Sequence, residues 1–144
     1  MGSYSQGAQK AGAYPGEGRD VGYGLCVQEV SIQAGGAATL DVVGYIPDGA
    51  QLVDVLLDTI TAHTSATATI AGGTAAGGTE LFPATDAKAG GRVRPTFTAA
   101  QLTVMRAMAH VSGEADVPVY LRLALGTPTS VGLTKVQLVY APKL

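Results

Sequence analysis

Few side chains in this sequence could carry out chemistry, and they are scattered along the chain. Histidine occurs only at His63 and His110, and neither has a cysteine or a second histidine at the spacing of a zinc site. Ser65 stands close enough to His63 for a nucleophile and its base, but no nucleophile-elbow sequence surrounds it. We therefore expect both histidines to be surface or half-buried residues at the ends of elements, with no catalytic residues and no metal site.

Two carboxylates, Asp54 and Asp58, stand four positions apart. On a strand they share a face directed to solvent, and on a helix they form an i,i+4 pair. A glycosidase needs two carboxylates but at no fixed sequence spacing, so this pair is a weak signal. The loop acids Asp48, Asp86 and Asp116 lack the dense spacing of a calcium loop. These residues disfavour an enzyme.

The glycine-rich stretch "GGTAAGGTE" resembles a phosphate-binding loop, because four residues separate Gly73 from Gly78. In that motif a lysine follows the second glycine and reaches the outer phosphates. Thr79 holds this position here. We interpret the stretch as a surface loop, and we expect no nucleotide or other cofactor.

The composition is poor in charge. Of the 144 residues, 14% are charged and 47% hydrophobic, and the net charge is −2. Nucleic-acid binding needs clustered basic residues, and Arg92 with Arg94 is the only basic pair, so we expect no nucleic-acid partner. No apolar run is long enough for a membrane span. Low charge favours a subunit of an assembly, although an ordinary alanine- and glycine-rich protein would show it too.

The single cysteine, Cys26, cannot form an internal disulfide. Its neighbours Leu25 and Val27 favour a buried position for this thiol, as a small hydrophobic residue.

The residues from Leu25 onward form runs rich in Val, Ile, Leu and Thr. These runs are separated by turns that contain Gly or Pro. This pattern is typical of short β-strands. The expected strands are 30–33, 38–46, 51–62, 66–70, 117–125 and 133–141. Residues 71–91 are expected to be a long connection of small residues with a short apolar segment at 81–83.

The stretch 51–62 is ambiguous, because it also shows a helical face. Its many β-branched residues favour a strand, since they crowd a helical turn. On that strand Val53, Val55, Leu57 and Thr59 share one face.

One short helix is expected over residues 99–109. Thr98 and Gln101 have the spacing of a capping box, and good helix formers follow them. Gly113 is placed to end the helix. Strands joined by turns, with one helix and no βαβ alternation, indicate an all-β antiparallel sandwich or barrel.

The first 24 residues differ from the rest. They hold seven glycines and three tyrosines, and no Val, Ile, Leu or Phe occurs before Val21. Such a segment cannot build a core, and ordering it costs roughly 1–2 kcal/mol per residue in backbone entropy. We expect an extended N-terminal arm over residues 1–24 and a β-sandwich domain over residues 25–144.

Several motifs between Val30 and Ala141 resemble, in their order, small structural proteins of tailed bacteriophages. They are "SIQAGGAATLDVVGYIPDGAQLVDVLLDTITA", "ATATIAGGTAAGGTELFPATDAKAGG" and "PVYLRLALGTPTSVGLTKVQLVYAPK". The resemblance implies an antiparallel β-sandwich or jelly roll without catalytic residues. It also implies a role on the virion, which is to decorate and stabilise the capsid by bridging adjacent shell subunits. The arm and the helix are additions to the family pattern.

The same resemblance implies partners and a location. The partner is the major capsid protein or another virion protein, and the place is the capsid exterior after synthesis in the host cytoplasm. We expect a homotrimer. A tail or head-completion component is an alternative. A glycan-binding β-sandwich module is another, which the lack of tryptophan and the position of three of the six tyrosines in the arm disfavour.

In such a virion protein, the arm is expected to bind the partner. Tyr4, Tyr14 and Tyr23 would be its anchors, with Pro15 beside Tyr14, because tyrosine gives a large contact area at low entropic cost. The alternatives are an arm folded back on its own domain, or first residues that are a cloning remnant.

Overall fold

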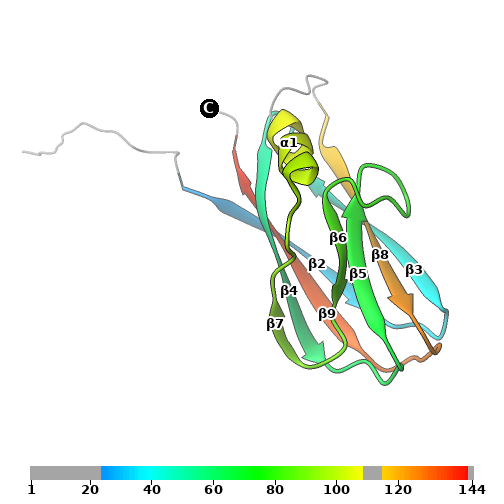
Figure 1. The fold of residues 1–144 in the computed structure, drawn as a ribbon. Helices are drawn as coiled ribbons and strands as arrows, with labels where there is room; N and C mark the ends of the chain where they lie inside the picture. Colours follow the sequence, from blue (N-terminus) through cyan, green and yellow to red (C-terminus); the bar gives the residue numbers. More distant parts are fainter. Residues whose placement is uncertain (1–23, 109–114, 143–144) are drawn as a thin grey trace, which may run out of the picture.

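Eight strands and one helix form the part of the chain that the computed structural model describes, residues 24–108 and 115–142 (Figure 1). The elements are β2 (Cys26–Gln33), β3 (Thr39–Ile46), β4 (Gln51–Thr61), β5 (Ala68–Gly73), β6 (Phe82–Asp86), β7 (Gly91–Val93), α1 (Ala99–Ala107), β8 (Val117–Leu125) and β9 (Leu133–Ala141).

The strands form two four-stranded antiparallel sheets, in the orders β2-β9-β4-β7 and β3-β8-β5-β6. The chain changes sheet at every step except from β5 to β6, and its first described strand pairs with its last. This is the strand order of a jelly roll, in which two four-stranded sheets pack face to face. The expected all-β sandwich is confirmed.

The core lies between the two sheets and is built by alternation along the strands. In β8, Val119, Leu121, Leu123 and Leu125 are buried while the residues between them are only half-buried. β9 contributes its inward residues in the same way. The fully buried large apolar side chains come from most of the elements: Ile32, Ile46, Leu52, Leu57, Ile70, Leu81, Phe82, Met105, Leu121, Leu123 and Leu138.

One predicted face is wrong at its first residue. A bulge between Leu52 and Asp54 places Leu52 and Val55 in the core, while Val53 is only half-buried. The extra residue shifts the side-chain alternation by one position. Beyond the bulge, Leu57 and Thr59 are buried as expected.

The expected long connection over residues 71–91 is also corrected, because it contains β6 and β7. Phe82 is fully buried, and its ring lies where a side chain at Gly72 would be. Glycine at that position therefore allows β5 and β6 to enclose an aromatic ring.

Cys26 is exposed, contrary to the expectation of a buried thiol. Figure 1 shows the beginning of β2 projecting beyond the body of the sandwich. The opposite sheet does not cover this end of the strand, so inward-pointing Cys26 and Gln28 remain exposed. Apolar neighbours in the sequence do not bury a residue where the second sheet is missing.

The helix α1 begins with the expected capping box. The Oγ1 of Thr98 accepts a hydrogen bond from the backbone N–H of Gln101, and the Gln101 side chain accepts one from the N–H of Thr98. The same Gln101 side chain donates to the carbonyl of Thr79 at 2.8 Å. The cap therefore ties the helix to the connection between β5 and β6. Gly113 lies outside the described residues.

Candidate functional site

His63 is part of a buried chain of polar side chains at the end of β4. Its Nε2 lies 2.9 Å from the Oγ1 of Thr134, which lies 2.9 Å from the Oγ1 of Thr59. The Thr59 hydroxyl donates to the carbonyl of Ala87, also at 2.9 Å. All three side chains are buried. The expectation that His63 is a surface or half-buried residue is wrong.

The hydrogen bonds define the protonation of this histidine. A carbonyl only accepts, so the single Thr59 proton goes to Ala87, and Thr134 must donate its own proton to Thr59. Thr134 can then only accept from His63, which places the imidazole proton on Nε2. The Nδ1 atom is buried without a hydrogen-bond partner among the described residues. Burial lowers the pKa of His63, since a charged ring would bring a second buried N–H without an acceptor.

Ser65 does not act with His63 as a nucleophile. It is buried, and its Oγ accepts the backbone N–H of Thr127 at 2.8 Å. The Ser65 side chain therefore holds the β8–β9 connection, and the His63 side chain holds β9, against the segment that follows β4. His110 lies outside the described residues.

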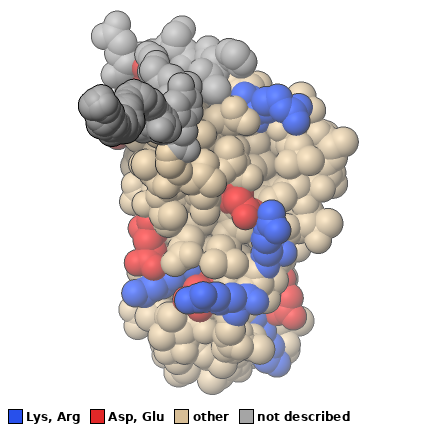
Figure 2. Space-filling model, turned by 90° about the vertical axis from the view of Figure 1, so that its left-hand side faces the viewer, with Lys and Arg blue, Asp and Glu red and all other residues tan. Residues whose placement is uncertain are grey.

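The carboxylates Asp54 and Asp58 share the outer face of β4, as expected for a strand. Each has a cationic partner: Arg94 lies 2.9 Å from Asp54, and Arg92 lies 3.6 Å from Asp58. Figure 2 shows acidic and basic side chains next to one another on this side of the molecule, with wide uncharged areas around them. Both carboxylates are paired with arginines, and nothing in this arrangement resembles an acid and a base around a substrate.

In the glycine-rich loop after β5, a carboxylate of the loop itself binds a backbone N–H group. The carboxylate of Glu80 accepts the backbone N–H of Thr74 at 3.0 Å, and this hydrogen bond lowers the pKa of Glu80. A side chain at Gly73 would fall 2.5 Å from the backbone of Gly78. The glycines therefore permit a close turn. Glu80 occupies the N–H of Thr74, and Thr79 stands where a phosphate-binding loop has its lysine.

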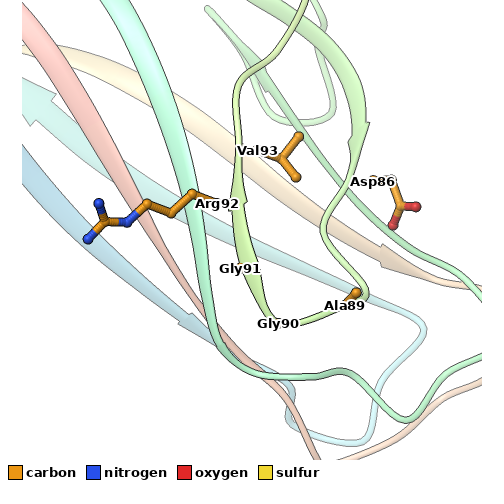
Figure 3. A pocket seen from close by; sticks show the side chains of 6 residues that line it. All are labelled: Asp86, Ala89, Gly90, Gly91, Arg92 and Val93. Carbon is orange, nitrogen blue, oxygen red and sulfur yellow. The ribbon is translucent and has the colours of Figure 1, made fainter.

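A hollow of about 170 Å³ lies at the turn between β6 and β7. Figure 3 shows its two charged lining residues, Asp86 and Arg92, pointing away from each other. Asp86 accepts the N–H of Lys88, and Arg92 faces Asp58. No polar groups converge on this hollow, so it lacks the features of a small-molecule site.

The outer face of the β3-β8-β5-β6 sheet carries an aromatic patch that the sequence did not indicate. Tyr45 stands opposite Pro118, and Val43 stands opposite Tyr120. Tyr45 is 51% exposed, Val43 is 38% exposed, and the other two are half-buried. We call these four residues the tyrosine face. The sequence showed which residues of each strand point outward, but it did not show that β3 pairs with β8.

The tyrosine face is bordered by an ion pair on one side and by an apolar groove on the other. At the next outward position, Arg122 donates two hydrogen bonds to Asp41, at 2.7 and 2.9 Å. On the other side, Pro118 also lines an apolar groove of about 300 Å³ beside α1, together with Thr74, Val104, Ala107, Met108 and Val117. The patch is thus a broad, nearly neutral surface with little polar chemistry of its own.

The site residues expected in the arm, Tyr4, Tyr14, Pro15 and Tyr23, lie outside the described residues. Within residues 24–108 and 115–142, no three His, Cys, Asp or Glu side chains stand close enough to hold a metal ion. In that same part of the chain, no helix has the length and hydrophobicity to cross a membrane.

Comparisons with protein-family models, with curated proteins and with solved structures found no match for this chain. The class of the protein therefore rests on its own fold, which over the described residues is a jelly-roll sandwich of two four-stranded sheets with one capped helix.

Proposed function

We propose that this chain is a non-enzymatic structural protein of a tailed-phage virion that decorates the capsid and bridges adjacent shell subunits. The tyrosine face is the observation that carries the proposal. Interfaces are enriched in tyrosine, and the face combines two tyrosines with Val43 and Pro118 on one exposed sheet. The jelly-roll order supports the proposal, because viral capsid domains use this architecture.

The mechanism is mechanical. A homotrimer presents three such faces and three arms at once, so contacts that are weak singly add up to an avidity about 10²–10⁴ times higher. In this proposal the arm tyrosines Tyr4, Tyr14 and Tyr23, with Pro15, lie across neighbouring shell subunits. A tail or head-completion role would use the same surfaces on a different part of the particle.

The test is sedimentation with empty capsid shells of the phage that encodes the chain. The full-length protein is expected to co-sediment, and Tyr45→Ala with Tyr120→Ala is expected to weaken the binding. Ile60→Ala is the control, because Ile60 is 55% exposed but lies on β4 of the other sheet. A double variant that binds shells as tightly as the wild type would refute the role of the face.

Removing residues 1–23 tests the arm separately. This segment holds no Val, Ile, Leu or Phe before Val21, so the sandwich is expected to remain folded by circular dichroism. Shell binding is expected to weaken. Undiminished binding would mean that the arm has no contact with the particle.

A second candidate function is glycan binding, which the same pair of tyrosines favours. Aromatic rings stack on the apolar face of a sugar, and Asp41 with Arg122 stands beside them as a polar group. Jelly rolls also occur among lectins. A glycan array with the Tyr45→Ala, Tyr120→Ala variant as control separates the two functions.

A further inference from the structure

The two sides of the sandwich differ in how their edge strands are protected. On one side the edges are β7, which has three residues, and β6, which has five residues and contains Pro83. Short edge strands and proline prevent pairing with another chain. This side is closed to strand addition.

On the opposite side the edges are β2 and β3, with eight residues each. Neither strand contains proline or lysine, and neither shows a register shift against its neighbour. The two strands lie close together, since a side chain at Gly44 would meet the Val30 side chain at 2.7 Å. We call the free edges of β2 and β3 the open side. Among the described residues, no backbone group of another segment pairs with the free edge of β2, and the carbonyl of Glu29 accepts only the Gln28 side chain, at 3.5 Å.

The surface around the β2 edge suits contact with another nearly neutral protein surface. Leu25 and Val27 are 60% and 56% exposed. Glu29 is the only charged residue of β2, and Lys135 of the same chain lies 3.9 Å from it. The β2 edge of one copy therefore meets the open side of a second copy without strong repulsion, and the contact buries apolar side chains that each copy leaves in water.

We propose that the open side is an interface between copies of this chain, in which the free edge of β2 pairs with the open side of a second copy. The inference locates the subunit contact that the proposed homotrimer requires. An eight-residue strand offers an edge of about 27 Å, and its backbone groups supply the hydrogen bonds. Gly24, the first described residue, precedes β2 directly, so the arm joins the chain next to this contact.

The test compares matched lysine substitutions on the two sides, in the full-length protein. Val27→Lys places a charge on the open side, and Val93→Lys places one on the closed side at β7, where Val93 is 40% exposed. Both positions are exposed, so both variants are expected to fold. In analytical ultracentrifugation the wild type and Val93→Lys are expected near three times 14.5 kDa, and Val27→Lys near the monomer mass.

The chain's single thiol gives a second readout on the same edge. Cys26 is exposed on β2, so its alkylation is expected to slow as the free subunit becomes rarer with rising protein concentration. In Val27→Lys the reaction is expected to be fast at every concentration. In Val93→Lys it is expected to follow the wild type.

Four results would overturn the inference: a monomeric wild type, an unchanged mass for Val27→Lys, equal dissociation by both lysines, or a Cys26 that reacts equally fast in the assembled protein. A thiol that is protected in the monomer and released by removing residues 1–23 would also overturn it, since the chain's own arm would then cover the edge. If the chain assembles through β2 but never binds capsid shells, the proposed interface between copies is supported and the proposed virion role is refuted.

Discussion

The imidazole ring of His63 fills the space where a side chain at Gly132 would lie. Gly132 has a φ of 147°, a region that residues with a side chain rarely adopt, and its missing Cβ would collide with the ring at Nδ1. The turn before β9 and the segment that follows β4 therefore depend on each other.

Gly132→Ala is expected to destabilise the fold strongly. Overpacking against a buried ring costs about 1–3 kcal/mol, and strain at positive φ adds to it. Urea unfolding measures the loss. The control is Gly35→Ala, because nothing lies within 4 Å of a side chain at Gly35. Equal stabilities of the two variants would contradict the packing of His63 on Gly132.

Acid is expected to weaken the fold through His63. Burial lowers the pKa of His63 in the folded state, while the unfolded chain keeps a value of about 6.5. Below that pH the unfolded state binds more protons, so the free energy of unfolding falls as the pH drops from about 6.5 toward the folded pKa. Above that window the contribution of His63 is constant.

The variant His63→Gln isolates this contribution, because His110 is present in both proteins. Its free energy of unfolding is expected to depend less on pH between 7 and the folded pKa than that of the wild type. Parallel pH profiles for the two proteins would show that His63 does not titrate differently on folding.

Core truncations in the last two strands are expected to be costly. Leu121 and Val136 are buried on inward faces, so Leu121→Ala and Val136→Ala should each lower the free energy of unfolding by about 1–5 kcal/mol. Lys135→Ala should change it little, because Lys135 points outward beside Val136. Three equal effects in a melting experiment would refute the register of β9.

The capping box of α1 is expected to contribute measurable stability. Thr98→Ala removes the acceptor for the Gln101 N–H and should cost about 0.5–2 kcal/mol. Gln101→Ala should cost more, since it also removes the bond to the Thr79 carbonyl. Thr103→Ala is the control, because this exposed residue bonds only within the helix. A larger loss for Thr103→Ala than for Gln101→Ala would contradict this order.

Local patterns in the sequence predicted the elements that are themselves regular. Alternation predicted β8 and β9 with the bounds that the structure shows, and the Thr98 and Gln101 spacing predicted the start of α1. β6 and β7 were missed, because Phe82–Asp86 contains Pro83 and Gly91–Val93 is too short to alternate. The bulge at Val53 was missed as well, since nothing in the strand's own residues signals an insertion.

Properties that depend on distant segments could not be predicted in the same way. The burial of His63 depends on Thr134 and Gly132, which belong to the far end of the chain. The tyrosine face depends on the pairing of Tyr45 with Pro118, and the exposure of Cys26 depends on where the opposite sheet ends. Each requires the register and extent of sheets that form between segments remote in sequence.

The strand order has a consequence for biosynthesis. The last two strands made, β8 and β9, are interior strands of their sheets: β8 lies between β3 and β5, and β9 lies between β2 and β4. During translation, β3 and β5 therefore lack their neighbour β8, and β2 and β4 lack their neighbour β9, until the final segment leaves the ribosome. Non-local pairing of this kind slows folding. A nascent chain of this protein therefore keeps strand edges without their partners until β8 and β9 have been made.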